Sequence, residues 1–456
     1  MNQLQTHIES RIESRIESHN EQQCDENTPH PRCHILGVLD DGIASLGAHA
    51  LAYLQQAQVV IGATRTLQLF AGQIAATAVQ HDLSAAIAKV PEWVRQAQAD
   101  NLRVVVLATG DPLCHGIAAY LGSRLCLEAI EVVPNVSTFQ LACARLGLPW
   151  QDMKFCSIHS RDAGDWVAGA EPTHGMYNLM REIRQHDRLA ILTSPENTPD
   201  RIARMLVTEG LADQFEMAVA ERLCQPQERI VSGISIAAAA ELPFADPNVV
   251  LLWRSRLVSK PVLFGLPDAS FEQRFPEKGL ITKNEVRAVS LARMQLRSTS
   301  IVWDIGAGSG SVGLEAARLC QTGHVYAIEK NLDDNAIIAR NRLAMGISNH
   351  TCVHGKAPEG LQAWPDPDAV FIGGSGGELS DLIHLVLARL KPQGWLIMNF
   401  VTLENLSCAV ETLKACGAQW DVLQLQASRS KPILHMNRMA AENPVWIVCA
   451  QQVAHA

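Results

Sequence analysis

The stretch that decides the fold class of this chain runs from Trp303 to Leu319 and reads WDIGAGSGSVGLEAARL. A short apolar run over residues 300–305 predicts a strand, and residues 310–320 predict a helix, so the glycines between them form the connection. Glycine allows a tight turn and lets backbone N–H groups approach a ligand closely. The stretch therefore predicts the first strand–turn–helix unit of a doubly wound nucleotide-binding sheet.

The sequence on both sides of this turn continues the alternation of strands and helices. We expect helices over residues 284–297, 333–345 and 379–390, and strands over residues 325–329, 351–354, 368–373, 394–399 and 445–451. Strands that alternate with helices in this order are typical of a parallel sheet with helices on both faces. The last third of the chain is therefore predicted to be a Rossmann-like α/β domain.

Three features of this domain indicate its ligand. Glu329 ends the second expected strand, where a carboxylate can accept hydrogen bonds from both hydroxyls of a ribose. Asp304 stands before the first glycine, where it can hold the ammonium group of a methionine moiety. The fourth strand ends in GGSGG over residues 373–377, which opens this edge of the sheet to a substrate. These features favour S-adenosylmethionine, with a nicotinamide cofactor or a purely structural glycine turn as the alternatives.

Four motifs occur in a fixed order in this part of the chain. They are GLITKNEVR at residues 279–287, the glycine stretch itself, VYAIEK at 325–330 and PDAVFIGGSGGEL at 367–379. From about residue 277 to its end, the chain resembles the C-15-methylating, decarboxylating methyltransferases of corrin biosynthesis. The resemblance implies an S-adenosylmethionine-dependent methyltransferase of the Rossmann-like class.

The resemblance also assigns residues to the cofactor. It implies that S-adenosylmethionine is bound by Gly306, Gly308, Gly310 and Glu329. The family usually has an acid after the third strand, facing the adenine, whereas this chain has Lys356 followed by Ala357. We expect the backbone of Ala357 to contact the adenine instead.

The first half of the chain shows an alternation of its own from His34 onward. Strands are expected over residues 35–39, 59–61, 104–108, 130–133, 189–193 and 249–253, and helices over residues 45–57 and 138–146. This order predicts a second α/β domain, with a largely parallel sheet.

Five motifs of this half also occur in order. They are VIGATRTLQLF at residues 60–70, GDP at 110–112, PNVST at 134–138, SPENTP at 194–199 and ERL at 221–223. Over residues 34–255 the chain resembles the tetrapyrrole methylase family, and within it the enzymes that methylate C-5 of the corrin precursor. The resemblance implies a cleft between loops in which S-adenosylmethionine is contacted by Gly110, Asp111, Ser137 and Thr138. Leu39 stands where the family usually has a glycine, and its side chain is expected to narrow this cleft.

The two resemblances divide the chain. We expect a polar tail over residues 1–33, the tetrapyrrole methylase-like domain over 34–255, a linker over 256–276 and the Rossmann-like domain over 277–456. The linker prediction depends on a cluster of prolines and glycines between the two alternations. The tail repeats the letters IESR and is expected to be solvated, with a partner-binding helix as the alternative.

Composition and charge disfavour several classes of protein. The net charge of −9 at pH 7 argues against a nucleic acid partner held by a basic surface. None of the 12 cysteines forms a CxxC pair, so no metal site is expected. No apolar run is long enough to span a bilayer, and the N-terminus is polar, which predicts a cytoplasmic protein without a membrane partner. We also expect a homo-oligomer.

Together the two resemblances imply one biosynthetic step, the conversion of precorrin-6B to precorrin-8X. Two methyl groups pass from S-adenosylmethionine to the meso carbons C-5 and C-15, and the ring C acetate loses carbon dioxide. An activated methyl group and a nucleophilic carbon need mainly in-line positioning, so neither a strong base nor a metal is expected, and no catalytic residue is assigned. For the carboxylates of the substrate, the expected basic partners are Arg161, Lys283 and Arg287, with His159, Arg429 and Lys431 as further candidates.

Three alternatives stay open at this point. The substrate can be the cobalt-bearing form of the same precorrin. The first domain can bind the macrocycle without methylating it, because Leu39 narrows the expected cleft. A methyltransferase acting on RNA or protein is disfavoured by the acidic net charge and by the tetrapyrrole methylase-like first half.

Overall fold

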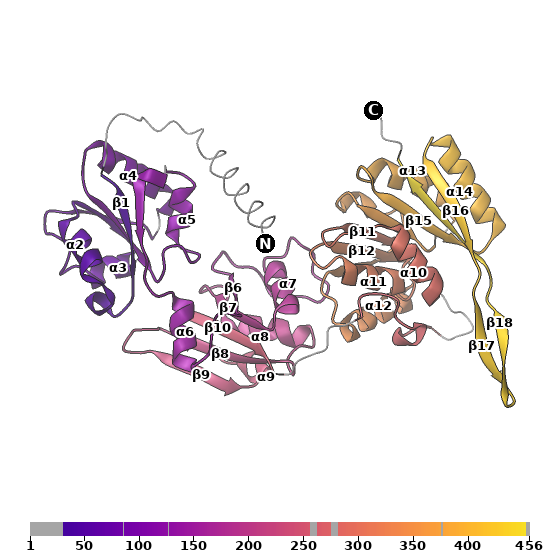
Figure 1. Ribbon diagram of the computed structural model, residues 1–456, viewed down its shortest axis with the longest axis horizontal. Coiled ribbons are helices and arrows are strands. Elements are labelled where there is room, and N and C mark those ends of the chain that lie inside the picture. Colours follow the sequence, from indigo (N-terminus) through magenta and orange to yellow (C-terminus); the bar gives the residue numbers. More distant parts are fainter. Residues whose placement is uncertain are drawn as a thin grey trace, which may run out of the picture.

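The computed structural model describes residues 31–84, 86–125, 127–255, 262–274, 281–374 and 377–452. The predicted tail over residues 1–33 lies outside the described residues, apart from its last part, residues 31–33. Three large β-sheets with flanking helices follow one another along the long axis of the molecule (Figure 1). The α/β class predicted from the sequence is confirmed by these sheets.

The first lobe contains a five-stranded parallel sheet in the order β3-β2-β4-β1-β5. Its strands are β1 (Cys33–Val38), β2 (Val59–Gly62), β3 (Val79–Asp82), β4 (Val104–Thr109) and β5 (Ile130–Val133). Its α-helices are α2 (Ala48–Gln56), α3 (Thr64–Leu69), α4 (Val90–Ala99) and α5 (Ile117–Gly122). β1 and β4 are apolar and buried along most of their length, as expected for central parallel strands covered on both faces. The carboxyl ends of these strands meet at one edge of the sheet.

The second lobe contains a mixed five-stranded sheet in the order β6-β7-β10-β8-β9. Its strands are β6 (Lys154–Ser157), β7 (Arg188–Leu192), β8 (Phe215–Glu221), β9 (Arg229–Ile234) and β10 (Asn248–Arg254). Its α-helices are α6 (Thr138–Leu146), α7 (Tyr177–Gln185), α8 (Pro199–Thr208) and α9 (Ile236–Ala239). β10 runs antiparallel to both β7 and β8, and β8 runs antiparallel to β9. The largely parallel sheet predicted for this half is therefore found only in its first lobe.

The second half contains a seven-stranded sheet in the order β13-β12-β11-β14-β15-β19-β16. Its strands are β11 (Ile301–Ile305), β12 (His324–Glu329), β13 (His350–His354), β14 (Ala369–Ile372), β15 (Trp395–Phe400), β16 (Gln419–Leu425) and β19 (Val445–Gln451). Its α-helices are α10 (Asn284–Arg293), α11 (Ser311–Leu319), α12 (Leu332–Ala344), α13 (Leu379–Arg389) and α14 (Leu403–Ala415). The order reverses at β11, which is the doubly wound arrangement with its ligand site at the carboxyl ends of the strands.

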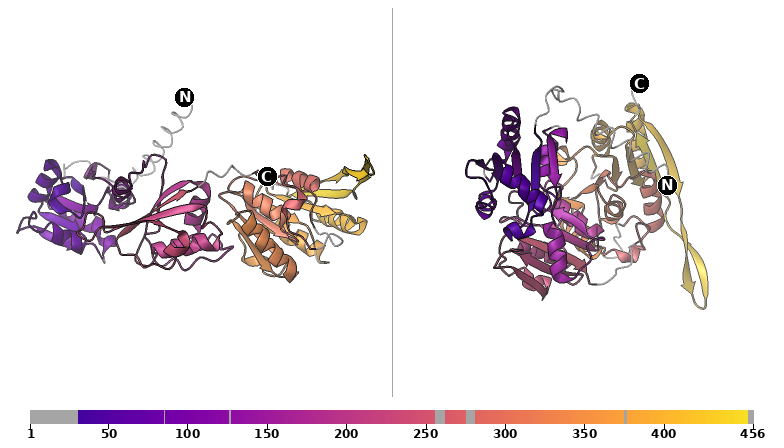
Figure 2. Two further views of the ribbon diagram at one scale, coloured as in Figure 1. Left: turned by 90° about the horizontal axis from the view of Figure 1, so that it is seen from below. Right: turned by 60° about the vertical axis from the view of Figure 1, so that its left-hand side comes forward.

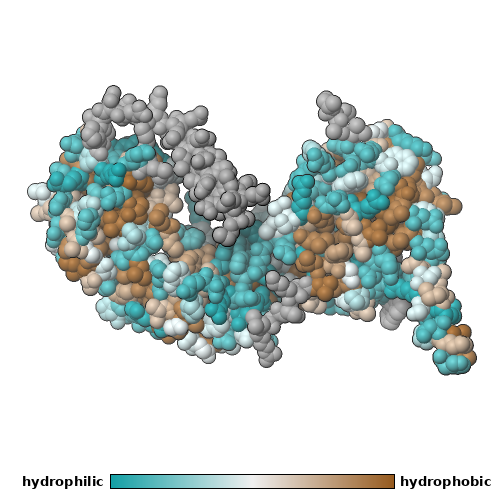
Figure 3. Space-filling view, in the orientation of Figure 1, coloured by the Kyte–Doolittle hydropathy of each residue, from teal (hydrophilic) through white to brown (hydrophobic). Residues whose placement is uncertain are grey.

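A two-stranded arm extends from this half. β17 (Ser428–Ile433) and β18 (Met436–Ala441) pair antiparallel and reach away from the body of the molecule (Figure 2). Apolar residues lie at its tip, where Leu434 is 90% exposed (Figure 3). Along the part of the chain that the structure describes, no helix is long and apolar enough to cross a membrane.

Residues 265–271 of the stretch predicted as a linker are attached to the second half. The backbone N–H groups of Gly265 and Leu266 donate hydrogen bonds to the Glu315 carboxylate on α11. Phe271 is buried in the core that α10 and α11 share with the sheet. The later part of this stretch is therefore packed structure, because a buried acid on α11 binds its backbone.

The second lobe packs against the amino-terminal ends of β12 and β13. Thr351 donates a hydrogen bond to the Gly169 carbonyl at 2.7 Å and so accepts from Nε2 of His324 at 2.9 Å. The other ring nitrogen, Nδ1, accepts from the Tyr177 hydroxyl on α7 at 2.7 Å. Burial lowers the pKa of His324 to about 3, so this imidazole is neutral and has one tautomer.

A buried carboxylate completes this interface. Glu209, which follows α8, is 1% exposed and accepts hydrogen bonds from Nε1 of Trp166 at 3.0 Å and from Arg184 at 2.9 Å. Arg342 of α12, in the second half, reaches the same carboxylate at 3.3 Å. The two halves are thus joined by hydrogen-bonded polar groups around a carboxylate that is removed from water.

Candidate functional site

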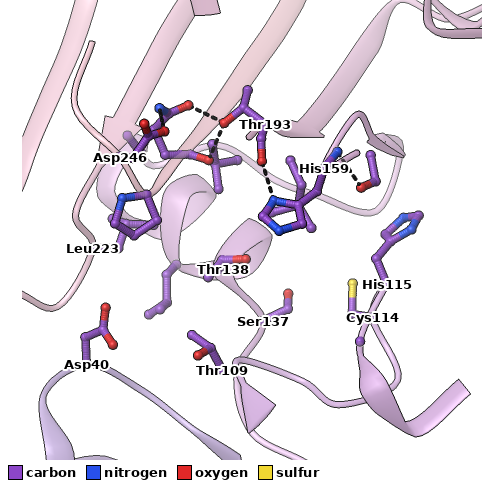
Figure 4. A pocket seen from close by; sticks show the side chains of 18 of the residues that line it. Asp40, Thr109, Cys114, His115, Ser137, Thr138, His159, Thr193, Leu223 and Asp246 are labelled. Atoms are coloured by element: carbon purple, nitrogen blue, oxygen red, sulfur yellow. Dashed lines mark hydrogen bonds between the residues drawn. The ribbon is translucent and has the colours of Figure 1, made fainter. Parts of the chain in front are cut away.

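A cavity of about 540 Å³ lies between the two lobes of the first half (Figure 4). The loops at the carboxyl ends of β1 and β4 form one wall, and the amino-terminal end of α6 forms the floor. The second lobe supplies the opposite wall through loops that follow β6 and β7 and precede β10. The lining from these elements includes Leu39, Asp40, Thr109, Asp111, Ser137, Thr138, His159, Thr193, Asp246 and Asn248.

Two glycines allow the loops of the first lobe to meet. A Cβ on Gly37 would lie 2.5 Å from the carbonyl oxygen of Gly110 and 2.7 Å from the backbone nitrogen of Asn135. Gly110 has a φ of +74°, and its N–H donates to the carbonyl of Val38. The Asn135 side chain donates to the carbonyls of Gly37 and Ser45, each at 3.1 Å. The strand ends are therefore locked together by backbone contacts that leave no room for a side chain.

The predicted cofactor residues of the first half come together at this edge. Ser137 caps α6, and its hydroxyl accepts from the backbone N–H of Gln140 at 3.2 Å. Asp111 accepts from the backbone N–H of Leu113 at 2.9 Å. Asp111, Ser137 and Thr138 line the cavity. Gly110 lies behind them, and a Cβ added to it would be 3.4 Å from the backbone nitrogen of Thr138. A polar ligand in the cavity therefore meets these three side chains.

Leu39 and Asp40 shape the mouth of the cavity. Leu39 lines it and is 7% exposed. Asp40 pairs with Arg65 at 2.9 Å and accepts from Nε2 of Gln225 at 2.6 Å, which connects the two lobes across the opening. The sequence did not predict the roles of Arg65 and Gln225, because their partner Asp40 lies far away along the chain. For Asp40, its position directly after the first strand was the one feature of the sequence that could have indicated a place in the site.

The second lobe presents a hydrogen-bonded wall. Nδ1 of His159 lies 2.7 Å from the carbonyl oxygen of Thr193. The Thr193 hydroxyl donates to Asn248, whose amide donates to the Asp246 carboxylate at 3.1 Å. Burial raises the pKa of Asp246, while the nearby His159 and Arg222 act in the opposite direction.

In the second half the glycine turn is held by Glu329. Its Oε2 accepts from the N–H of Gly308 at 2.8 Å, and its Oε1 accepts from the N–H of Asn331 at 2.9 Å. Gly306, Gly308 and Gly310 all have positive φ, between 56° and 77°. Each carboxylate oxygen has a second lone pair, so Glu329 can hold the turn and still accept from a ribose hydroxyl.

Orphaned polar atoms lie beside this turn. Asp304 is 1% exposed; its Oδ2 accepts from the N–H of Gly313 at 2.9 Å, and its Oδ1 is buried without a partner among the described residues. The Ser309 hydroxyl is also buried without one. Burial raises the pKa of Asp304 to about 7, and the charge of Glu329 adds to the shift. A glycine turn with unpartnered polar atoms fits S-adenosylmethionine, whose ribose and amino acid groups bring the missing hydrogen bonds.

The remaining predicted residues lie around the same edge or away from it. Ala357 is buried, and the neighbouring Lys356 pairs with Glu378 at 2.5 Å. Glu378 lines a smaller cavity of about 220 Å³ at the start of α13. Lys283, 46% exposed at its side chain, lies 4.0 Å from Asp268. Arg161 is exposed, and no described residue forms an ion pair with its side chain.

The prediction that Arg287 binds substrate is wrong. The residue is fully buried, and its guanidinium donates to Glu315, Asp268 and the carbonyl of Leu266. Phe271 stacks beneath it, 4.7 Å from the guanidinium carbon. Arg287 therefore attaches residues 265–271 to α11 and has no free face for a substrate carboxylate.

Comparisons with known proteins match the two halves of the chain to two different families. Residues 32–240 match the family described as tetrapyrrole (corrin/porphyrin) methylases, and residues 273–451 match the family described as the precorrin methyltransferase domain. A protein from Sinorhizobium named precorrin-6Y C(5,15)-methyltransferase (decarboxylating) is 32% identical, over 91% of this chain and 95% of the relative.

Two further relatives cover only part of this chain. A protein from Pyrobaculum calidifontis named probable cobalt-precorrin-6B C(15)-methyltransferase (decarboxylating) is 37% identical, over 41% of this chain and 95% of its own length. A crystal structure of a precorrin-6Y C5,15-methyltransferase from Geobacter metallireducens is 40% identical, covers 42% of this chain and 97% of that chain, and has a TM-score of 0.40.

Proposed function

Because the chain belongs to the family of the decarboxylating precorrin-6Y C(5,15)-methyltransferases, we propose that its two halves carry out the two methyl transfers at separate sites. The half before residue 256 methylates C-5, and the half after residue 276 methylates C-15 and releases carbon dioxide. The observation that carries this division is the presence of two unlike sites, one between the lobes and one at the glycine turn. A relative named for the C-15 reaction alone covers only 41% of this chain, which supports the same division.

In the second half, this chain contributes mainly orientation. When bound, S-adenosylmethionine supplies a methyl group that its positive sulfur has already activated. Glu329 binds the ribose, and the backbone of Ala357 contacts the adenine. Binding in one geometry makes the transfer effectively unimolecular, which can lower the barrier by about 7–11 kcal/mol.

Loss of carbon dioxide balances the charge at C-15. A neutral macrocycle that gains a methyl group from a sulfonium also gains one positive charge. When the carboxylate of the ring C acetate leaves as carbon dioxide, the electron pair of the broken carbon–carbon bond stays in the conjugated macrocycle and neutralises that charge. The second half therefore needs a pocket for the acetate but no proton acceptor for this step.

In the first half, Asp111, Ser137 and Thr138 bind the cofactor at the edge of the first lobe. The macrocycle enters between the lobes, where Arg65 is the arginine of the lining. Exposed Arg161 and Lys283 stay candidate partners for substrate carboxylates. The cytoplasmic location, the homo-oligomer and the absence of a nucleic acid partner stay predictions.

The full chain tests the division directly. Precorrin-6B and S-adenosylmethionine with a ¹³C-methyl group are added, and methylation at each meso carbon and release of carbon dioxide are measured separately. We expect Glu329→Ala to remove C-15 methylation and carbon dioxide release, while exposed Glu359→Ala retains both. Loss of C-5 methylation in Asp111→Asn, with the C-15 reaction intact, separates this proposal from a first half that only binds the macrocycle.

The same assay distinguishes the two forms of the substrate. Precorrin-6B with and without cobalt is supplied to the wild-type chain in parallel. Release of no carbon dioxide from either form contradicts the proposal for the second half.

A further inference from the structure

His159 stands out among the cavity residues because one of its ring nitrogens is oriented and the other is free. It follows β6 and lines the cavity from the second lobe (Figure 4). Nδ1 lies 2.7 Å from the Thr193 carbonyl oxygen, and a carbonyl only accepts. Nδ1 therefore carries the proton in the neutral ring, and Nε2 has an unshared electron pair. No described residue forms a hydrogen bond with Nε2.

The carbonyl that orients this ring is itself fixed. Thr193 is 5% exposed, and its hydroxyl lies 2.5 Å from Oδ1 and 3.1 Å from the carbonyl of Asn248. The Asn248 amide in turn donates to the carbonyl of Ala245 and to the Asp246 carboxylate. A ring held by such a wall keeps its tautomer, as in sites where a carbonyl orients a catalytic histidine.

Methylation at C-5 leaves a charge that must be removed, as at C-15. At C-15, carbon dioxide leaves and the charge is neutralised by the electron pair it leaves behind. No carboxylate is lost at C-5, so a proton must leave the methylated macrocycle instead. The first half, unlike the second, therefore needs a proton acceptor within its cavity.

We propose that Nε2 of His159 accepts this proton, an inference that depends on the proposed C-5 activity of the first half. The meso carbon gains the methyl group as the methyl–sulfur bond breaks, and the electron pair of that bond stays on sulfur. The macrocycle, now carrying one positive charge, loses the proton of the methylated meso carbon to Nε2. The electron pair of the broken C–H bond returns to the conjugated system, and the imidazole becomes imidazolium. The sum is one methylated neutral macrocycle, one thioether and one proton held by His159.

The charges around the ring suit this role. Asp246 also lines the cavity, and a positive charge on His159 lowers the pKa of this carboxyl against the effect of burial, so the imidazolium and the carboxylate favour each other. Asp40 and Asp111 also line the cavity, while its basic groups are Arg65, paired with Asp40, and His115. Of the two cavity histidines, His159 alone has a ring nitrogen hydrogen-bonded to a described residue.

The test uses the full chain with His159→Ala. Loss of a general base typically lowers a rate on the order of 100-fold to 10,000-fold, so we expect C-5 methylation to fall in that range. C-15 methylation and carbon dioxide release are measured in the same chain and stay unchanged, as does binding of S-adenosylhomocysteine by calorimetry. Added imidazole restores part of the C-5 rate in His159→Ala. His49→Ala, exposed on α2 outside the cavity, retains every activity.

A second measurement needs no turnover. Side-chain ¹⁵N spectra of the wild-type chain and of His159→Gln identify the His159 signals, and the proposal requires the proton on Nδ1 in the neutral ring. A neutral ring protonated on Nε2, or a His159→Ala chain that methylates C-5 at the wild-type rate, overturns the proposal. So does a loss of C-5 activity that imidazole does not relieve. If the wild-type chain itself does not methylate C-5, the proposed function of the first half fails instead.

Discussion

The candidate sites in the two halves of the molecule are built in different ways. In the second half, the site is one continuous glycine turn whose main chain is held by Glu329. In the first half, it is a cavity of about 540 Å³ lined by residues from both lobes. One site is therefore encoded within a few consecutive residues, and the other exists only after distant loops have met.

The largest difference between the two sites is expected when a side chain is added where the loops of the first half are in contact. Gly37→Ala places a Cβ 2.5 Å from the Gly110 carbonyl oxygen, and backbone atoms cannot move aside as a flexible side chain can. We expect C-5 methylation to fall at least about 1000-fold, the scale of losing a positioned catalytic group, while C-15 methylation is unchanged. The ¹³C-methyl assay measures both.

A matched glycine controls for the extra methyl group. Gly47 precedes α2, and a Cβ there has nothing within 4 Å. Gly47→Ala is expected to retain C-5 methylation. Equal activity of the two alanine variants contradicts the view that the first site depends on close packing of its loops.

The difference between the sites also explains what the sequence predicts well. The strand–turn–helix unit around Asp304 and the acid Glu329 lie close together along the chain, so local pattern reveals them. The wall of Thr193, Asp246 and Asn248 was not predicted, because its members lie at the end of β7 and at the start of β10, two strands that pair antiparallel. Strand–helix alternation predicts parallel neighbours and contains no signal for that pairing.

Arg287 is a second case in which local sequence pattern did not reveal a contact with a distant residue. A basic residue within a family motif suits a substrate carboxylate, and nothing in its neighbours indicates burial. The structure buries it against Glu315, 28 residues further along the chain. Loop residues 265–271 pack onto this pair, and their proline and glycine content predicted a linker instead.

The next largest effect is expected at the interface between the halves. Glu209→Gln removes the negative charge that Arg184 and Arg342 share. Loss of one partner of a buried ion pair costs about 3–5 kcal/mol of stability. Urea unfolding measures the change in the free energy of unfolding. Glu216 is the control, because it also accepts from a tryptophan, Trp253, but is exposed. Glu216→Gln is expected to change stability by no more than about 0.5 kcal/mol.

A smaller effect is expected for the pH dependence of the free energy of unfolding, through Asp304 in the second half. Burial raises the pKa of Asp304 to about 7 from its ordinary value of 3.8, so between these values the folded state binds more protons than the unfolded state. The contribution of Asp304 to stability is therefore fully present below pH 3.8 and is lost as pH rises toward 7, by at most about 1.4 kcal/mol per pH unit. Asp304→Asn removes this slope, and the difference between the two unfolding profiles measures it. Parallel profiles for variant and wild type contradict the assignment.

The smallest effect is expected when the two reactions are placed on different molecules. The halves touch at the amino-terminal ends of β12 and β13, through His324 and Thr351, whereas Glu329 ends β12 at the opposite edge of the sheet. Five residue-to-residue steps along β12 separate these edges, roughly 16 Å, so the second site does not open onto the interface. An intermediate that leaves one half must therefore pass through solvent to reach the other.

An equal mixture of Asp111→Asn and Glu329→Ala should form the doubly methylated product at about half the wild-type rate. Each active half is diluted twofold in the mixture, and the covalent connection between the halves gives no advantage to an intermediate that passes through solvent. A much slower mixture indicates that the intermediate is passed within one molecule, by a route that the contact at the amino-terminal edge does not provide.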